Sequence, residues 1–211
     1  MAKRRKLGNP LALTVMVLLA ERSMHPYEIA QTLRRRGKQH SVKINFGSLY
    51  TVVQNLEKHG YVEVAGVQRQ GNRPERTLYG ITEAGRAEML DWLSDLIAVP
   101  AEEYPAFDTA LALLPVLPPD EVNELLGDRE QAQTVRAAAL RGVLAQLGDS
   151  LPRVFVVETE YQLHMLEAQV EWIARFRKEI GDATLGGIEE WRSFHETGQV
   201  PQDWKDLDEP Q

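Results

Sequence analysis

Hydrophobic residues in the first 60 positions recur at helical spacing and predict three short helices. The first is mostly apolar and covers about residues 10–20, the second covers residues 26–36, and the third covers residues 47–59. Proline opens the first two helices, where a first turn tolerates it, and glycine follows the last two, where it favours a helix end. In the second helix the spacing places four residues inward: Tyr27, Ile29, Ala30 and Leu33.

The third predicted helix combines an apolar stripe with a face of small polar residues. Leu49, Val53 and Leu56 fall at positions i, i+4 and i+7, so we expect them to face the core. Side chains of the type found on the other face reach base edges and phosphates in a DNA groove. The outward positions are Ser48, Thr51, Gln54, Asn55 and Lys58.

Two strand-like runs, residues 61–67 and 76–82, follow the third helix and enclose a basic turn. Gly71 and Asn72 supply turn chemistry between them. Arginines around a hairpin tip serve no packing purpose, which favours contacts with phosphates or with the minor groove. These arginines are Arg69, Arg73 and Arg76. A short helix closed by glycine and followed by a basic hairpin is typical of a winged helix-turn-helix.

The rest of the chain predicts helices. A fourth helix begins at Thr82, and a short packed helix ends near Pro115. Two long helices cover residues 120–147 and 153–180, and a shorter one covers residues 188–195. Helices of about 25 residues extend about 40 Å, longer than a small domain needs, which favours packing against a partner. The expected fold is mainly α: an N-terminal winged helix-turn-helix with a two-stranded β wing, followed by an all-helical dimerisation domain.

Charge divides the chain unevenly. Residues 1–89 hold 15 Lys and Arg against 7 Asp and Glu, a net charge of +8, whereas residues 90–211 carry a net charge of −15. A DNA duplex meets the field of the facing domain and not the chain average of −7. We therefore expect a DNA-binding domain at residues 1–98, a helical dimerisation and effector domain at residues 99–200, and a polar tail at residues 201–211.

Several function classes are disfavoured by the sequence. It contains no cysteine, which excludes disulfides, thiolate metal sites and a thiol nucleophile. It also contains no Gly-rich phosphate loop and no G-x-S-x-G motif, so we expect no enzyme, no catalytic residue and no cofactor. The five histidines show no metal spacing. His164, with Glu160 and Glu167 on one helical face, is expected to form solvated side-chain pairs and no metal site.

The first 20 residues mimic a signal peptide, because the basic MAKRRK precedes the apolar LALTVMVLLA. However, the apolar run is only about ten residues long, and Leu18 and Ala20 make a poor cleavage site. No later stretch approaches the roughly 18 apolar residues that a membrane span needs. A cytoplasmic protein with no membrane partner is therefore expected.

Four segments resemble the PadR family of bacterial transcriptional regulators, in its larger form with a full C-terminal helical domain. The segments are HPYEIAQTL, GSLYTVVQNLEKHGYV, GNRPERTLYGITEAGR and YQLHMLEAQVEWI. The second and third are specific as a pair, and together the four segments are spread over most of the chain.

The resemblance implies a homodimer that presents two winged helices to a near-palindromic operator in double-stranded DNA. Such regulators are typically repressors that release DNA when a small ligand, often aromatic or antimicrobial, binds. Short family members bind flat drugs with a tryptophan on the helix after the wing. By this resemblance Trp92 is the candidate ligand residue, although it lies about one turn earlier on that helix than in those members. The expected dimerisation residues are Leu163, Met165, Leu166, Trp172, Ile173 and Phe176.

The predicted DNA contacts come from the third helix, its entrance and the wing. For Tyr50 two roles stay open, a ring anchored in the core or a hydroxyl that reaches a phosphate. The predicted DNA-binding residues are Lys43, Asn45, Ser48, Tyr50, Thr51, Gln54, Asn55, Arg69, Arg73 and Arg76.

Two alternatives remain at this stage. A winged helix can serve protein association without touching DNA, although the basic N-terminal half disfavours this version. A DNA-binding protein can also act as a constitutive repressor or as an activator, and the sequence does not separate these roles. The operator, the regulated genes and the effector are not determined by the sequence.

Overall fold

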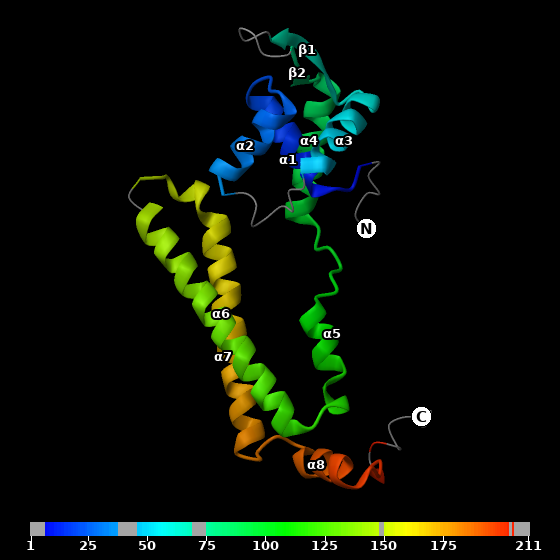
Figure 1. Ribbon diagram of the computed structural model, residues 1–211, viewed down its shortest axis with the longest axis vertical. Coiled ribbons are helices and arrows are strands. Elements are labelled where there is room, and N and C mark those ends of the chain that lie inside the picture. The colour runs from blue at the N-terminus through cyan, green and yellow to red at the C-terminus, as the bar shows by residue number, and fades with distance from the viewer. Residues whose placement is uncertain (1–6, 38–45, 69–74, 148–149, 203, 205–211) are drawn as a thin grey trace. The chain divides into compact units, whose positions relative to one another are not determined.

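The chain folds into two compact units, residues 1–103 and 104–211 (Figure 1). The predicted mainly helical fold is confirmed, with one two-stranded antiparallel sheet. The predicted division between residues 98 and 99 falls at the end of the fourth helix. The computed structural model describes residues 7–37, 46–68, 75–147, 150–202 and 204.

The three predicted N-terminal helices are present in the first unit, and their apolar stripes form its core. The stripe of the third helix is confirmed, since Leu49, Val53 and Leu56 are buried, and Val52 is buried beside them. The first helix is covered on most sides, with seven buried residues. The bounds of the helices are Pro10–Glu21 for α1, Pro26–Arg35 for α2 and Phe46–Lys58 for α3.

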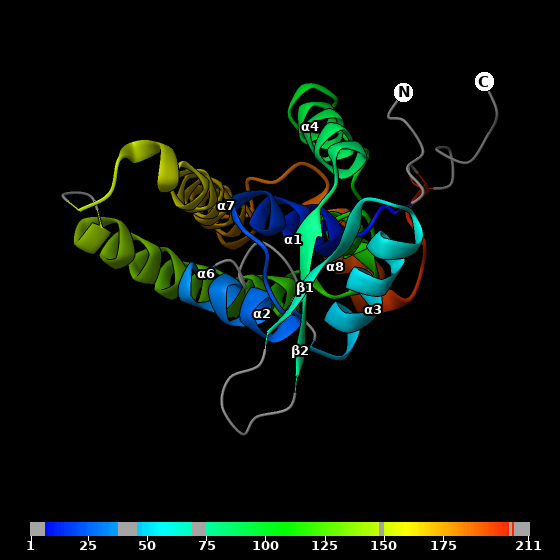
Figure 2. The same cartoon turned by 90° about the horizontal axis from the view of Figure 1, so that it is seen from above.

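The wing is an antiparallel hairpin of β1 (Val62–Gln68) and β2 (Arg76–Ile81), with Val62 opposite Ile81. A short bridge ties the turn between α1 and α2 to this hairpin. The backbone N–H of Met24 donates to the Tyr79 carbonyl at 3.0 Å, and the Tyr79 N–H donates back at 3.0 Å. The helix-turn-helix and the wing are therefore joined by backbone hydrogen bonds, and α3 lies beside the strands (Figure 2).

The end of α3 and the start of α4 (Glu83–Ala98) meet at the base of the wing. Gly60 ends α3 in the left-handed region at φ +74°, which glycine adopts without strain. Thr82 caps α4: its hydroxyl accepts from the Gly85 N–H at 3.0 Å and donates to the Gly60 carbonyl at 2.7 Å. One side chain thus joins the two helix ends, as expected for a cap at Thr82.

The inward prediction for Tyr27 was wrong, because its side chain is 48% exposed. The buried stripe of α2 contains Pro26, Ile29, Ala30 and Leu33, which follow the spacing i, i+3, i+4 and i+7. Tyr27 is one residue, or about 100°, away from the start of that stripe.

The second unit is helical throughout its described elements. The helices α6 and α7 lie side by side as antiparallel rods (Figure 1). The predicted helix at residues 153–180 begins later than expected, because Pro152 precedes a short 3₁₀ turn, η3. The bounds are Ala106–Ala112 for α5, Leu114–Val116 for η2, Pro119–Leu147 for α6, Arg153–Phe155 for η3, Val157–Gly181 for α7 and Ile188–Thr197 for α8.

Polar contacts fasten the helices of the second unit around its core. Arg177 of α7 donates from Nε to the Asn123 carbonyl at 3.0 Å, and its Nη1 pairs with Glu130 at 2.6 Å. Trp191 of α8 donates its indole N–H to the Leu117 carbonyl at 2.8 Å. The core itself contains Val122, Leu126, Ile173, Ile180, Ile188 and Trp191. Among the described residues, no helix is both long enough and apolar enough to cross a membrane.

Candidate nucleic-acid interface

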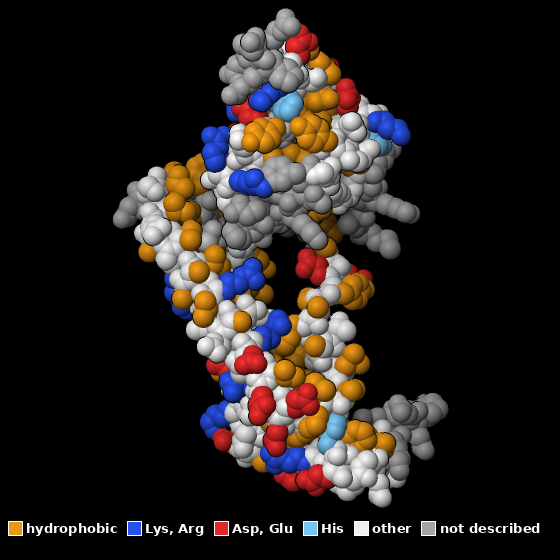
Figure 3. All heavy atoms as spheres, in the orientation of Figure 1, with side chains coloured by type: hydrophobic (Ala, Val, Ile, Leu, Met, Phe, Trp, Pro, Cys, Tyr) orange, Lys and Arg blue, Asp and Glu red, His pale blue; other side chains and the backbone are white. Residues whose placement is uncertain are grey.

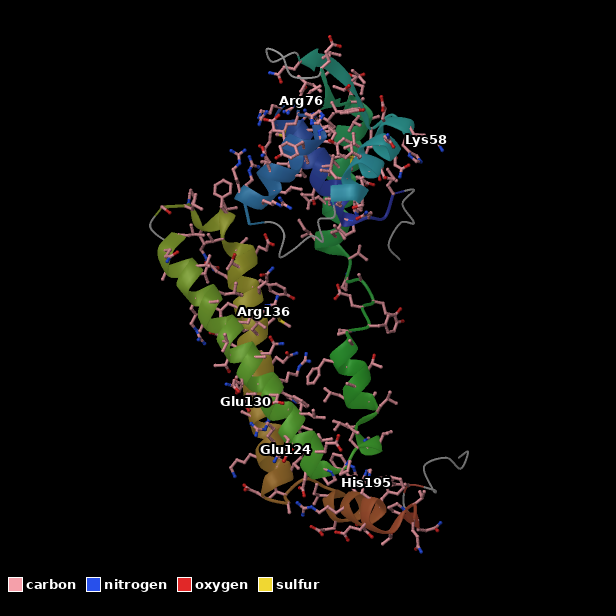
Figure 4. All side chains as sticks on the ribbon, in the orientation of Figure 1. Lys58, Arg76, Glu124, Glu130, Arg136 and His195 are labelled. Carbon is pink, nitrogen blue, oxygen red and sulfur yellow. The ribbon has the colours of Figure 1, made fainter. Side chains whose placement is uncertain are left out.

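The polar face of α3 is open to solvent, as its sequence pattern predicted. Thr51 and Gln54 are exposed, and Ser48 and Asn55 are partly exposed. Lys58 lies at the C-terminal end of the helix (Figure 4). Tyr50 is 49% exposed, so its ring is not part of the core. The helix therefore presents hydroxyl, amide and ammonium groups on the side away from its apolar stripe.

A polar hollow of about 690 Å³ lies between the start of α2, the exposed face of α3 and the wing. The two half-exposed tyrosines, Tyr27 and Tyr50, line it together with Arg76 at the start of β2 (Figure 4). The His25 and Tyr50 rings meet edge to face, with centroids 6.2 Å apart. The remaining lining residues of this polar hollow are Glu28, Gln31 and Gln68.

His25 caps α2 and lies next to the positive charge of the wing. Its Nδ1 accepts a hydrogen bond from the Tyr27 N–H at 3.1 Å, which requires that this nitrogen carry no proton. Burial of the ring is the main cause that lowers the pKa of His25, and the charge of Arg76 lowers it further against the opposing effect of Glu28. The cap is therefore formed by the neutral imidazole.

This arrangement makes the stability of the first unit depend on pH. In the folded protein the pKa of His25 lies below the ordinary value of 6.5, so the unfolded chain binds the proton more readily. We expect the free energy of unfolding to fall as the pH falls through 6.5 towards the folded value. His25→Asn should keep the cap and reduce this slope in denaturant titrations between neutral and mildly acidic pH. The exposed His164→Asn serves as the control, and an equal slope in wild type and His25→Asn would contradict the assignment.

Part of the positive charge of the first unit is neutralised by exposed ion pairs. Arg36 binds both carboxylate oxygens of Glu21, at 2.5 and 2.7 Å, and this hydrogen bonding lowers the pKa of that carboxyl. Arg22 pairs with Glu28 at 2.5 Å. Arg76 at the start of β2 lines the polar hollow and adds a positive charge to it.

The structure brings together some of the sequence-predicted DNA-binding residues. Ser48, Tyr50, Thr51, Gln54 and Asn55 share α3, and Arg76 faces the same hollow as Tyr50. Five lining residues were missed from the sequence, although the motif HPY carries a signal: a histidine before Pro26 can cap the helix. The missed residues are His25, Tyr27, Glu28, Gln31 and Gln68. Four further predicted contacts lie outside the described residues: Lys43, Asn45, Arg69 and Arg73.

The expected ligand and dimerisation residues differ in how deeply they are buried. Trp92 is only 5% exposed, within the core of the first unit. Ile173 is fully buried inside one chain, so it is not available to a partner, and Trp172 stacks on Phe176 with centroids 5.0 Å apart. Met165 is 51% exposed. Leu163 and Leu166 are partly exposed.

The carboxylates near His164 bind arginines. Glu160 pairs with Arg153 at 2.9 Å, and Glu167 pairs with Arg141 at 2.7 Å. The residues that the structure describes contain no group of three or more His, Asp or Glu placed to hold a metal ion.

Comparison with known proteins relates both the sequence and the fold to transcriptional regulators. Residues 15–91 match the model of the transcriptional regulator PadR-like family. No functionally curated protein matches the chain in sequence.

The solved structures similar to this chain extend across both units. Bacillus subtilis PadR in complex with operator DNA shares 19% identity at a TM-score of 0.68, over 82% of this chain and 99% of that chain. B. subtilis PadR in complex with p-coumaric acid shares 16% identity at a TM-score of 0.63, over 81% and 98%. The Vibrio cholerae virulence activator AphA shares 15% identity at a TM-score of 0.61, over 82% and 99%. At these identities the likeness establishes the fold, including the helical second unit.

Proposed function

We propose that the protein is a sequence-specific DNA-binding regulator that acts as a homodimer, on the premise that its residues 15–91 match the PadR-like family of transcriptional regulators. One observation carries the proposal. A single polar hollow is bordered by three parts of the first unit: the exposed face of α3, the N-terminus of α2 and Arg76 at the start of β2. Three elements distant in the sequence thus present donors and acceptors to one surface.

Contacts with DNA bases and contacts with phosphates are assigned to different parts of this surface. Thr51 and Gln54 on α3 are exposed and carry the short polar groups that read base edges in the major groove. Tyr27, Tyr50 and Arg76 surround the polar hollow, where hydroxyls and a guanidinium suit a phosphate of the DNA backbone. The positive end of the α2 dipole favours an anion at the same place.

This division of roles predicts different results for two substitutions. Arg76→Ala should weaken binding to all DNA sequences by a similar factor and reduce the salt dependence, because one phosphate contact is lost. Gln54→Ala should instead change which base is preferred, with a loss of about 10-fold to 100-fold on the best sequence. Mobility-shift titrations at several salt concentrations, with sequenced bound fragments, measure both effects.

The control for this pair is Gln131→Ala, at an exposed position of α6 in the second unit. It should leave affinity and salt dependence unchanged. Unaltered DNA binding by Arg76→Ala would remove the polar hollow from the interface, and an unaltered preference by Gln54→Ala would remove α3 from base reading.

The regulatory part of the proposal is a repressor that binds a near-palindromic operator and releases it when a small ligand binds. The structural neighbours supply the motivation, since B. subtilis PadR has been solved with operator DNA and with p-coumaric acid. AphA is described as an activator, so transcription of a reporter placed behind the bound fragment is the measurement that decides the sign. An increase in transcription on addition of the protein would contradict repression.

The homodimer is supported by apolar surface that a single chain leaves uncovered. On α7, Tyr161 is 65% exposed and Met165 is 51% exposed, and on α4 Ile97 is 79% exposed. Exposed apolar patches mark association surfaces, so α7 and α4 each carry a candidate for one. A winged helix used for protein association alone is the alternative, and sequencing the genomic fragments retained by the purified protein tests it. Retention of no fragment above background would favour that alternative.

A further inference from the structure

An apolar groove of about 460 Å³ runs between α5, η2 and α6 in the second unit, and we call it the α5–α6 groove. Leucine, valine and alanine side chains and the Phe107 ring form its walls. Several of these side chains remain open to solvent, among them Val116, which is 73% exposed, and Leu125, which is 50% exposed. Hydrophobic side chains gather along α5 and the facing side of α6 (Figure 3).

Arg129 is the charged residue among the described residues that line the α5–α6 groove. Its guanidinium carbon lies 3.7 Å from the centroid of the Phe107 ring, a cation–π contact. Phe107 in turn meets Trp172 edge to face, with centroids 6.4 Å apart. Two aromatic rings therefore hold the position of a positive charge at the wall of an apolar groove.

The described residues do not compensate this charge. The Nε of Arg129 is buried without a hydrogen-bond partner among them. Its Nη2 donates to Gln169 Oε1 only at 3.5 Å, and that oxygen already accepts from Gln133 at 2.7 Å. The neighbouring carboxylate of Glu130 is paired with Arg177 at 2.6 Å. Among the described residues, this guanidinium with its five donors therefore has one side-chain acceptor, at 3.5 Å.

We infer that the α5–α6 groove binds an amphipathic monocarboxylate, with an alkyl body along the leucine and valine walls and the carboxylate on Arg129. A carboxylate matches the planar guanidinium and supplies charge-assisted hydrogen bonds that are stronger where water is excluded. The groove volume lies within the range of about 300 to 1,000 Å³ that small-molecule sites occupy. The apolar walls of the groove thus bind the alkyl end of the ligand, and the charge of Arg129 binds its carboxylate end.

The bound carboxylate is the effector of the regulator, and this role rests on the proposed function. α5 is the first helix after the division between the two units at residues 103 and 104. It has no fully buried residue, and its Phe107 ring packs on Arg129. A ligand that bridges α5 and α6 therefore acts on the segment of chain that leads to the DNA-binding unit.

Calorimetric titration of the full chain without DNA tests the site, with decanoate and its neutral isostere decanamide as probes. The wild type should bind decanoate at least about 10-fold more tightly than decanamide, because only decanoate carries a charge opposite to that of Arg129 and can pair with the guanidinium through two equivalent oxygens. Arg129→Gln should lose this preference and bind both probes equally weakly. Leu114→Trp, which fills the groove, should lose binding of both probes. The matched control is Arg136→Gln on the same helix and outside the lining of the groove, and it should keep the preference (Figure 4).

Three outcomes would overturn the site. The first is equal affinity of the wild type for the two probes, and the second is an undiminished preference in Arg129→Gln. The third is that the wild type binds neither probe and that Leu114→Trp changes a dimer into a monomer. This result would mean that a second copy of the chain occupies the groove.

Mobility shifts on a retained DNA fragment separate the site from its regulatory role. Release of wild-type protein by decanoate, with Arg129→Gln kept on the DNA, supports an effector. Decanoate that binds without releasing DNA overturns the effector role. A protein that binds decanoate and no DNA fragment contradicts the proposed function, whereas the calorimetric preference still supports the carboxylate site.

Discussion

Replacing both Tyr161 and Met165 by glutamate is expected to turn the protein into a monomer and to lower its affinity for a two-site operator by about 100-fold or more. The two side chains are 65% and 51% exposed and lie four residues apart on α7, so they share one face of the helix. A carboxylate placed on each would have to be buried without a partner if that face met a second copy. Loss of the dimer removes the advantage of binding two half-sites at once. Sedimentation measures the first effect and mobility shifts measure the second.

Ala174→Glu is the control for this double substitution, because it adds a carboxylate to an exposed position of the same helix on the side opposite Tyr161 and Met165. It should leave both the mass and the affinity unchanged. A double variant that stays dimeric would place the association surface elsewhere, for example on the exposed apolar residues of α4.

Gly85→Ala is expected to destabilise the first unit by about 3 kcal/mol or more. A Cβ at this position would lie 1.9 Å from the Tyr61 carbonyl oxygen, a backbone atom that cannot move aside like the end of a side chain. The substitution would push the start of α4 away from Tyr61, next to the point where Thr82 joins the ends of α3 and α4. The loss should appear as a lower midpoint for this unit in denaturant titrations, together with weaker DNA binding.

Gly142→Ala provides the matched comparison, since this glycine also lies inside a helix and a Cβ there meets nothing within 4 Å. Alanine should stabilise α6 by about 0.5 to 1 kcal/mol through its higher helix propensity. If Gly85→Ala were as harmless as Gly142→Ala, the close approach of α4 to Tyr61 would not exist in solution.

Local sequence patterns were sufficient to predict those features that depend on residues within one helix or one hairpin. The stripe of Leu49, Val53 and Leu56 predicted both the helix and its buried side, because burial follows the 3.6-residue period. The cap at Thr82 was predicted because threonine is a preferred residue at the start of a helix, and the hydrogen bond to the Gly85 N–H is present. The start of the last long helix was misplaced by four residues, because the residues after Pro152 form the 3₁₀ turn Arg153–Phe155 before the helix begins at Val157.

The sequence by itself determined the helices, the hairpin, the winged helix-turn-helix and the unequal division of charge, because each depends on residues close together in the chain. Only the tertiary structure decided which side chains share a surface. It placed Tyr27 beside Tyr50 and Arg76 in the polar hollow, and it buried Ile173 inside its own chain. It also brought Phe107 onto Arg129, two positions whose meeting depends on how α5 packs against α6. Such contacts join residues from different elements, and no periodic pattern within one element encodes them.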